Sequence, residues 1–554
     1  MQNTSKTASA KNIPSSSSFW TRLQPGSQLL VAALAALAAG LAASLMAVVL
    51  MGILRLAAGV PTPLELFGDH VLKLLSVGQF LQLLIKFGPH AKTEPLGLAL
   101  LGMIGAGTAL GLLYAVVVRV MLPVSGYRPT RREWLTAATL AGGMTLTAVV
   151  LFWGETGQNF LGLPLGWAML VTALSLLADF SLYGLTLCLA YRALLPQQPP
   201  VKAPASQGRV PIYRARGRRQ LLAGAGVAVL SVGAGAGSLA LIRSFLNNDN
   251  FTSYDGTETS AHNGFTAPIT PNSEHYVVTQ NPVDPTANLD VWRLEITGLV
   301  SHPGTYTYEQ LKSLPSTSRA VTLECIANGP GGRFISTAIW QGVTLRTLLE
   351  KQGGALPNAR YVALYSLDGY TVSQPLDEVL AADALLAWHM NGVPLPNRHG
   401  FPLRALIPGR YGEENAKWVT RVELTDHFVS GLYADQGWYY GLLHTMNRID
   451  RPRGPLALGQ TIEIGGIAFA GNRGIQKVEV SVDDGVTWHQ ATLDPAPSQD
   501  SWVLWSWQWK PSLAGQYTLV ARATDGTGEV QTSHQQGTVP NGATGYHTVV
   551  VQVG

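Results

Sequence analysis

Residues 29–54 read LLVAALAALAAGLAASLMAVVLMGIL, a run of 26 residues without a charged side chain. At 1.5 Å per helical residue, this run is long enough to cross the hydrocarbon core of a bilayer with some tilt. Four further apolar runs follow: Pro95–Val118, Trp134–Gly154, Leu163–Ala190 and Leu221–Ile242. The sequence therefore predicts an all-α transmembrane bundle of five helices over residues 29–244.

The composition supports a division of the chain into two halves. Only 13% of the 554 residues are charged and 47% are hydrophobic, a low charge content for a soluble protein. Residues 1–244 contain 19 Lys+Arg and 6 Asp+Glu, a net charge of +13, whereas residues 245–554 contain 19 and 28, a net charge of −9. These values exclude a single soluble globule and a disordered chain, and the acidic half excludes a nucleic-acid binder there. The two cysteines exclude a disulfide framework.

The basic residues predict the orientation. The N-terminal tail, residues 1–28, and the loops after the second run and before the fifth are basic, whereas residues 155–162 contain no positive charge. The positive-inside rule then places the N-terminus in the cytoplasm and everything after Ile242 outside, on the periplasmic or extracellular face. Arg218-Arg219 before a Gly/Ala-rich run also resembles a twin-arginine export signal, although an ordinary positive-inside flank has the same pattern.

Two features of the membrane half need separate interpretation. Residues 64–88 are apolar but are interrupted by charged residues such as Asp69 and Lys73, which favours an amphipathic surface or re-entrant segment. Asp179 lies near the middle of the fourth run. It is either a proton-transferring or quinone-linked group or, as we favour, a structural residue hydrogen-bonded to neighbours such as Ser175. None of the 12 histidines falls in a predicted span, so the membrane half is predicted to be an anchor without haem.

The second half contains three predicted parts. Residues 245–274 are rich in Asn, Thr, Ser, Gly and Pro without periodicity, which is typical of a linker. Residues 275–453 mix short β-type runs with short helical stretches, which predicts an α+β domain. Residues 454–554 alternate strands and turns, as in QKVEVSV at 476–482, and this predicts an all-β immunoglobulin-like sandwich.

The sequence LECIAN at 323–328 contains Cys325, the only cysteine outside the predicted spans. A lone cysteine is most often a buried small hydrophobe. Its thiolate is also a soft, strongly donating metal ligand, and an unligated thiol outside the cytoplasm is open to oxidation. The residue alone does not decide between these interpretations.

The motifs around Cys325 resemble those of a known enzyme family, and this resemblance favours the metal-ligand interpretation. The pattern T-L-E-C-x-x-N at 322–328 is followed by ISTAIWQGV at 335–343, MNGVPLP at 390–396, HGFPLR at 399–404, IPG at 407–409 and KW at 417–418. This ordered series resembles the sulfite oxidase family of molybdopterin enzymes, and VSVDDGVTW at 480–488 resembles that family's dimerisation domain. The resemblance covers residues 275–554 and implies an enzyme with a molybdenum–molybdopterin cofactor. The membrane half lies outside it.

The resemblance also implies individual roles. Cys325 corresponds to the protein ligand of molybdenum. The cofactor-binding positions correspond to Tyr276, Thr279, Gln280, Asp368, His399, Arg404, Asn415, Ala416 and Lys417. The cationic groups His399, Arg404 and Lys417 suit the pterin phosphate, since a guanidinium can donate two hydrogen bonds to it. A catalytic tyrosine is expected at Tyr439 or Tyr440.

The sequence departs from sulfite-oxidising members of the family. Where those enzymes hold a dianionic substrate with arginines, this chain has Val277 and Val278 in one loop and Gly329-Pro330 after the cysteine motif. Arg410 is a candidate to replace one of the lost arginines. The loop at 276–281 looks more like that of the bacterial sulfoxide-reducing branch. The predicted reaction is a two-electron oxo transfer at molybdenum on a small sulfur oxyanion or a sulfoxide.

The predicted partners are a small-molecule substrate, the lipid bilayer, a second copy of the chain, and an external electron carrier, either a cytochrome or a quinone-linked protein. No nucleic acid is expected. Two alternatives stay open at this point. The exported half is a non-enzymatic surface or assembly module with a degenerate cofactor pocket, or the membrane helices themselves transport a solute or pass electrons through Asp179.

Overall fold

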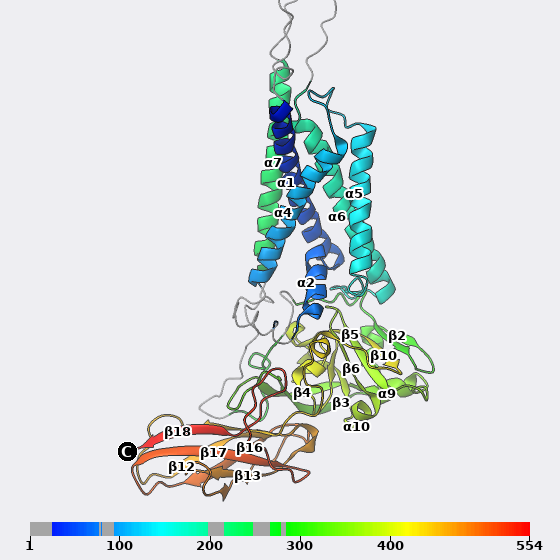
Figure 1. Ribbon diagram of the computed structural model, residues 1–554. Coiled ribbons are helices and arrows are strands. Elements are labelled where there is room, and N and C mark those ends of the chain that lie inside the picture. Colours follow the sequence, from blue (N-terminus) through cyan, green and yellow to red (C-terminus); the bar gives the residue numbers. More distant parts are fainter. Residues whose placement is uncertain (1–24, 77–78, 80–92, 198–214, 247–265, 279–283) are drawn as a thin grey trace, which may run out of the picture. The chain divides into compact units, whose positions relative to one another are not determined.

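The computed structural model describes residues 25–76, 79, 93–197, 215–246, 266–278 and 284–554 (Figure 1). The chain divides into two compact units. The first consists of residues 1–53, 99–151 and 174–243, and the second of residues 54–98, 152–173 and 244–554. The second unit therefore combines two short segments of the N-terminal half with the whole C-terminal half.

The first unit is helical. Its helices are α1 (Pro25–Ala58), α4 (Thr93–Val118), α5 (Arg131–Leu151), α6 (Leu165–Leu194) and α7 (Ala215–Leu246). Within the described residues, five helices are long and apolar enough to cross a membrane, and they coincide with the five predicted runs. Small residues let two of them approach closely, since a Cβ at Gly111 would lie 2.3 Å from the carbonyl oxygen of Ala36. The predicted anchor is thus a set of closely packed apolar helices.

The favoured role of Asp179 is not supported by its contacts. The side chain is buried in α6, as expected for a residue facing other helices. Its Oδ1 has no hydrogen-bond partner among the described residues, so this atom does not form the expected bond to a neighbour such as Ser175. The buried position was predicted correctly, but the proposed hydrogen bond was not.

The first sheet of the second unit has the strand order β2-β1-β10-β5-β6. Its strands are β1 (Leu294–Gly298), β2 (Gly304–Tyr306), β5 (Tyr361–Ser366), β6 (Thr371–Pro375) and β10 (Val419–Thr425). Strands β1 and β10 pair in parallel and the other pairs are antiparallel. The buried face of this sheet shares a core with Trp292, Trp388 and Trp418.

Short helices border this sheet. They are α8 (Tyr308–Lys312), α9 (Leu345–Lys351), α10 (Leu376–Ala381) and α11 (Leu432–Asp435). Thr307 begins α8 with a capping box, because its hydroxyl accepts from the Gln310 amide while the Gln310 side chain accepts from the Thr307 amide. Thr344 likewise accepts from the Thr347 amide at the start of α9. Side-chain caps therefore fix where the helices begin.

The second sheet carries the cysteine motif at the end of its edge strand. Its strand order is β3-β4-β7-β8, with β9 also paired to β7. The strands are β3 (Thr317–Glu324), β4 (Ile335–Thr344), β7 (Leu385–Met390), β8 (Val393–Pro394) and β9 (Arg404–Leu406). The mixture of sheets and short helices confirms the predicted α+β domain.

The C-terminal part contains strands and turns, as predicted, and forms two four-stranded antiparallel sheets. One sheet has β11 (Met446–Arg451), β12 (Ile462–Phe469), β15 (Thr492–Leu493) and β16 (Val503–Trp509), and the other has β13 (Ile475–Ser481), β14 (His489–Gln490), β17 (Gly515–Asp525) and β18 (His547–Val553). Both sheets contribute to one core that includes Ile464, Trp505 and Leu519. The two layers of strands are drawn in orange and red in Figure 1. The immunoglobulin-like topology stays a prediction.

Two segments that precede this half in the sequence belong to the same compact unit. Helix α2 (Pro63–Leu74) begins at a capping box of Thr62 and Glu65, and it occupies the first part of the predicted amphipathic segment. The loop 152–164 is bonded to the α+β domain by backbone contacts, from the Asn159 amide to the Leu367 carbonyl at 3.1 Å and from the Asn288 amide to the Leu161 carbonyl at 2.9 Å. Residues 77–78 and 80–88 of the amphipathic segment lie outside the described residues.

The predicted linker is structured where it is described. The Thr270 amide donates to the Thr337 carbonyl at 2.7 Å, and the indole of Trp502 donates to the Pro268 carbonyl at 2.9 Å. The Thr266 hydroxyl donates to Asp450, also at 2.7 Å. Residues 266–274 are therefore bonded to both the α+β domain and the C-terminal part, because their polar backbone and hydroxyl groups find fixed partners there. The remainder, 247–265, lies outside the described residues.

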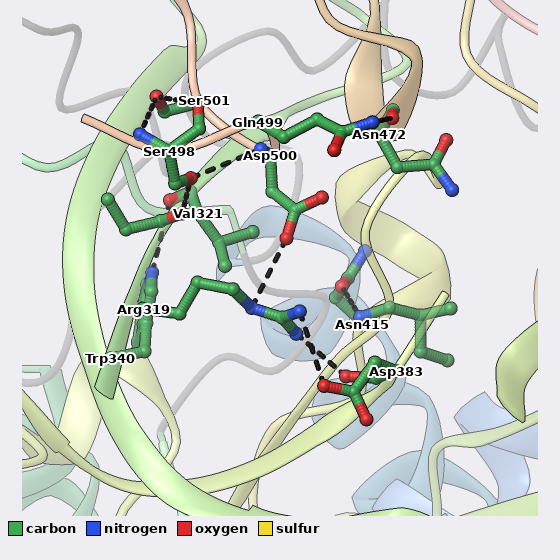
Figure 2. Close-up of polar contacts among 12 residues, drawn as sticks. Arg319, Val321, Trp340, Asp383, Asn415, Asn472, Ser498, Gln499, Asp500 and Ser501 are labelled. Atoms are coloured by element: carbon green, nitrogen blue, oxygen red, sulfur yellow. Dashed lines mark hydrogen bonds and ion pairs between the residues drawn. The ribbon is translucent and has the colours of Figure 1, made fainter. Parts of the chain in front are cut away.

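The C-terminal part contacts β3 through the loop 498–502 (Figure 2). Arg319 on β3 lies between two carboxylates, with Nε 3.2 Å from Asp500 and a terminal nitrogen 3.5 Å from Asp383. The Thr322 amide donates to the Asp500 carbonyl at 3.0 Å, and the Trp502 amide donates to the Thr322 hydroxyl at 2.8 Å. This contact attaches the C-terminal part to the strand that ends at Cys325.

We predict that Arg319→Met destabilises this contact. Burial raises the pKa of Asp500 and Arg319 opposes that effect, so removal of the guanidinium leaves a largely buried carboxyl without its cation. The expected loss is about 1–3 kcal/mol, measured as a lower urea midpoint of the full chain by tryptophan fluorescence. Lys312→Met, which removes an exposed pair with Glu309, should change stability by less than about 0.5 kcal/mol. Equal midpoints for the two variants would contradict the prediction.

We predict that acid weakens the C-terminal part through His547. Its Nδ1 accepts from the Ile449 amide at 2.9 Å, and burial, with Arg448 nearby, lowers its pKa to about 4. In the unfolded chain this histidine binds a proton near its ordinary pKa of 6.5, whereas in the folded chain it binds one only near pH 4. Stability therefore falls as the pH decreases from about 6.5 to about 4. The loss attributable to His547 between pH 7 and pH 5 is about 2 kcal/mol. His547→Gln should remove this part of the slope in urea titrations, and an unchanged slope would refute the assignment.

Candidate functional site

Cys325 is the first residue after β3 and opens the loop that leads to β4. Its amide donates to the Phe334 carbonyl at 2.9 Å, and its carbonyl accepts from the Asn328 amide at 2.8 Å. Both backbone groups of the cysteine are therefore bonded inside the loop. The position of the sulfur follows from the end of a sheet strand rather than from a free loop.

The spacing of the cysteine motif has a structural cause. The side chain of Asn328 donates to Glu324 Oε1 at 2.9 Å and accepts from the Phe334 amide at 3.0 Å. One amide group thus joins the last residue of β3 to the residue before β4 and closes the loop around Cys325. Glu324 and Asn328 belong to the quoted motif, but their role in closing the loop was not predicted, because it depends on how the loop folds.

The cysteine lies in an apolar environment. It is 8% exposed and belongs to a cluster with Tyr276, Val321, Trp340 and Leu406. Burial, followed by the nearby Glu413 carboxyl, raises the pKa of the thiol to about 12. Binding of a metal cation at this sulfur would release the thiol proton.

A second group of predicted residues lies beside this cluster. The rings of His275 and His399 are 5.0 Å apart, and the His275 ring also contacts Trp340 at 5.6 Å between centroids. Arg404 donates to the His399 carbonyl at 3.2 Å, and its guanidinium lies 5.5 Å from the Trp340 ring. Because Trp340 and Tyr276 also pack with Cys325, the structure brings the predicted residues Tyr276, Cys325, His399 and Arg404 together.

Both histidines of this group are neutral. Burial, with Arg404 nearby, lowers the pKa of His275 to about 3. Burial, with His275 and Arg404 nearby, lowers the pKa of His399 well below its ordinary value. Arg404 therefore supplies the positive charge of the group, while the imidazoles act as hydrogen-bonding groups. His275 was not predicted from the sequence, where the only indication of its role is its position directly before Tyr276.

The polar atoms of this group fit a phosphate-bearing pterin. Around this group, three buried donors have no hydrogen-bond partner among the described residues: Arg404 Nε, the Tyr276 hydroxyl and Asn397 Nδ2. His275 Nδ1 lies 3.1 Å from the Tyr276 carbonyl, which requires the proton on Nδ1 and leaves the unpartnered Nε2 as an acceptor. A phosphate accepts hydrogen bonds and a pterin ring both donates and accepts them. The residues present therefore match the implied group in charge and in hydrogen-bonding capacity.

The segment 415–417 is hydrogen-bonded to β9 and to the loops beside it. The Asn415 side chain accepts from the Ile407 amide at 2.6 Å and donates to the Tyr411 carbonyl at 2.7 Å, so it fixes the loop before it. The Ala416 carbonyl accepts from the Ala405 amide at 2.8 Å. Lys417 donates to the Val278 and Arg398 carbonyls at 3.1 and 3.3 Å. Lys417 therefore joins the predicted covering loop at 276–278 to the His399 turn.

The other predicted cofactor residues lie elsewhere. Asp368 accepts from the Tyr370 amide at 3.1 Å and lines a cavity that also contains Asp69 of α2. Thr279 and Gln280 lie outside the described residues. The role of these three residues stays a prediction.

The predicted catalytic side chains form a separate cluster. Arg410 is ion-paired with Glu378 and lies 3.6 Å from Glu414, so its charge is already engaged. Arg410 and Tyr440 line a cavity of about 600 Å³ together with Phe428. The Tyr439 hydroxyl donates to the Leu442 carbonyl at 2.9 Å, outside this cavity lining. Of the two tyrosines, Tyr440 is the one that faces a cavity.

Glu413 connects the two clusters. Burial raises its pKa well above the ordinary value, with Glu414 adding to this effect. Its carboxyl influences the thiol of Cys325 and the hydroxyl of Tyr440, and its carbonyl accepts from the Tyr370 hydroxyl. Glu413 was not predicted from the sequence, because two adjacent glutamates between glycine and asparagine are typical of a solvated turn.

Comparisons with known proteins assign the two C-terminal parts. Residues 280–433 match the model for the oxidoreductase molybdopterin binding domain. Residues 451–554 match the Mo-co oxidoreductase dimerisation domain. The two matches follow each other in the order predicted from the motifs.

Individual relatives match about half of the chain. The chain is 31% identical over 330 residues to inducible nitrate reductase [NADH] 2 of Glycine max, covering 48% of this chain and 36% of that protein. It is 28% identical over 330 residues to nitrate reductase [NADH] 2 of Phaseolus vulgaris, with the same coverage. The chain thus spans about a third of the length of these curated relatives. The solved sulfane dehydrogenase SoxCD of Paracoccus pantotrophus aligns at 25% identity and a TM-score of 0.45, covering 49% of this chain and 76% of that one.

We predict that Arg404→Gln reduces cofactor retention. A charge-assisted hydrogen bond contributes about 1.5–3 kcal/mol, so the loss corresponds to roughly 10- to 100-fold weaker binding. The measurement is molybdenum and released pterin per chain after gel filtration. Arg346→Gln is the matched control, because this exposed arginine donates to the Leu380 carbonyl away from the site. Equal molybdenum contents in the two variants would remove Arg404 from the cofactor site.

Proposed function

Because the chain is a molybdopterin oxidoreductase of the sulfite oxidase family, we propose that it is a membrane-anchored enzyme whose catalytic half acts outside the cytoplasmic membrane. The reaction is a two-electron oxo transfer on a small sulfur oxyanion or a sulfoxide. The observation that supports this proposal is the burial of the Cys325 thiol beside Tyr276, His275 and Arg404. The side chains of these three residues still have hydrogen-bonding atoms without a partner among the described residues.

The cofactor supplies redox chemistry at molybdenum when bound, and the chain supplies its position and surroundings. Cys325 is the protein ligand, held by the closed loop of Asn328. Arg404 and Lys417 provide positive charge toward the phosphate, and His275 and His399 orient hydrogen bonds while neutral. The apolar cluster around Cys325 excludes water, which strengthens each electrostatic contact in the site.

The surroundings disfavour a dianionic substrate. The described positions that would carry arginines hold Val277, Gly329 and Pro330, and Arg410 is engaged by two carboxylates. A neutral sulfoxide does not need the compensating cations that a dianion such as sulfite needs. Nitrate, the substrate that the relatives' names contain, carries a single negative charge and is the third candidate.

The membrane assignment rests on sequence and helix length. Five apolar helices of 18 or more residues and the basic flanks support a multi-pass anchor with the N-terminus inside. The dimerisation domain supports a homodimer, and its two packed sheets support an immunoglobulin-like topology. Electrons come from a cytochrome or a quinone-linked donor.

We predict about one molybdenum per chain in the purified full-length protein produced with a cofactor-synthesising host. Cys325→Ser should alter the absorption bands of the metal centre and abolish turnover, because a hydroxyl is a harder and weaker donor than a thiolate. Cys188→Ser is the matched control, since this buried cysteine lies in α6. A folded protein without molybdenum or pterin would favour the alternative, a non-enzymatic surface module with a degenerate pocket.

We predict a substrate order from charge. Methionine sulfoxide with reduced viologen should turn over faster than nitrate with the same donor, and sulfite with ferricyanide should be the slowest. The measurement is kcat/KM for each substrate with the same molybdenum-loaded preparation. Fast sulfite oxidation would contradict the charge argument, and no turnover of any of the three would refute the substrate class.

A further inference from the structure

A cavity of about 200 Å³ lies inside the second unit, on the side of the α+β domain that α2 and the loop 152–164 cover. Its walls come from three parts of the chain. Helix α2 contributes Asp69, Leu72 and Lys73, and the loop 152–164 contributes Gln158 and Leu163. The α+β domain contributes the remaining wall, which includes Ser366 at the end of β5, Asp368 and Tyr370 in the turn before β6, and Arg421 of β10.

The walls are held in place by specific contacts. Gln158 donates to Asp69 at 2.8 Å, and Lys73 lies 2.9 Å from Glu155. Gln436, at the C-terminal end of α11, donates to the Leu72 carbonyl at 3.1 Å and so joins α2 to α11. Gly369 permits the approach of the opposite wall, because a Cβ there would lie 2.3 Å from Gln158 Nε2. The cavity is therefore a built feature of the second unit.

Two polar atoms in the walls have no hydrogen-bond partner among the described residues. They are Gln158 Oε1 and Ser366 Oγ, on side chains that are 7% and 6% exposed. Burial raises the pKa of Asp69 to about 7, and the neighbouring Asp368 adds to this effect. A buried polar atom without a partner is costly, so these atoms favour a ligand that brings hydroxyl groups.

The charges in the walls disfavour an anionic ligand. Lys73 is paired with Glu155, and Arg421 lies 3.7 Å from Glu423 while it stacks on Tyr365 at 3.6 Å. The carboxyls of Asp69 and Asp368 face the same space. A phosphate would meet these carboxyls, whereas a neutral aromatic ring with hydroxyl groups would meet Leu72 and Leu163 on its faces. The volume is below the roughly 300 Å³ of drug-sized sites and suits one ring.

The chain connectivity indicates where such a ligand comes from. Helix α2 begins five residues after α1 ends at Ala58, and the loop 152–164 joins the end of α5 directly to the start of α6. The three helices α1, α5 and α6 each contain a candidate membrane span. Two walls of the cavity are therefore covalently continuous with three candidate spans, which favours a lipid-soluble ligand.

One contact leads from the cavity to the loop that contains Glu413. Tyr370 lines the cavity, and its hydroxyl donates to the Glu413 carbonyl.

We propose that this cavity binds the headgroup of a membrane hydroquinone, an inference that rests on the proposed function. The hydroquinone gives up two electrons and two protons and becomes a quinone. A substrate XO takes two electrons and two protons and becomes X and water, so the net reaction is QH₂ + XO → Q + X + H₂O. The hydroxyl groups of the hydroquinone donate to Gln158 and Ser366, and the carboxyl of Asp69 lies beside them.

The test uses the full-length protein in nanodiscs of neutral lipid and a quinone with a ten-carbon tail, decylubiquinone, in its reduced form. The variants are Ser366→Ala, which removes an unpartnered hydroxyl and so preserves the fold, and Gln158→Met. Gln460→Met is the matched control, because this glutamine is exposed on the C-terminal part. Each variant is assayed by calorimetric binding of decylubiquinol and by substrate reduction driven either by decylubiquinol or by reduced viologen.

The expected result is about tenfold weaker decylubiquinol binding in Gln158→Met and a smaller loss in Ser366→Ala, with viologen-driven reduction unchanged. Quinol-driven reduction should fall in the same order, and Gln460→Met should match the parent chain. Unchanged binding in both cavity variants overturns the proposal. The proposal is also overturned if added phosphatidylglycerol displaces the bound quinol, because that result assigns the cavity to an anionic headgroup. If the parent chain shows no viologen-driven reduction, the proposed function is refuted instead, while calorimetry still tests the cavity.

Discussion

The closure of the cysteine loop by Asn328 is the constraint on which the candidate site depends. The end of β3 and the start of β4 are neighbouring antiparallel positions, and the loop between them must turn without letting Cys325 reach solvent. One side-chain amide satisfies this requirement by bonding to Glu324 and to the Phe334 amide. The cysteine then faces the apolar side of the sheet, where Tyr276 and Trp340 already pack. The position of the sulfur is thus a property of the sheet.

The same burial that protects the thiol makes the site incomplete without its cofactor. Unpartnered buried polar atoms on Arg404, Tyr276 and Asn397 each cost about 1–3 kcal/mol when nothing binds them. A ligand that satisfies these atoms in the folded state adds its binding energy to stability. Folding and cofactor insertion are therefore coupled.

The sequence predicted the elements and the central site residues more successfully than the outer ones. Alternation and turn residues located β13, predicted at 476–482, to within one residue, because this alternating run is bounded by Gly474 and by the turn at Asp483 and Asp484. The motifs predicted Cys325, His399 and Arg404, and the structure brings them together with Tyr276. Glu413 and His275 were missed, because a buried glutamate and a neutral buried histidine depend on packing that no local pattern reveals. Arg410 was expected near substrate, but sequence alone could not show that Glu378 and Glu414 would engage it.

The separation of this chain into two units does not follow the boundary between its apolar and polar halves. Helix α2 and the loop 152–164 precede the α+β domain by more than a hundred residues, yet both are bonded to it. The loop forms backbone hydrogen bonds with Leu367 and Asn288, and the Leu72 carbonyl of α2 accepts from the Gln436 side chain. Composition could not reveal this, since both segments are short and bordered by apolar helices. The α+β domain is therefore covered on one side by two segments that the sequence places next to α1, α5 and α6. The covered side is the one that contains Asp368 and Tyr370.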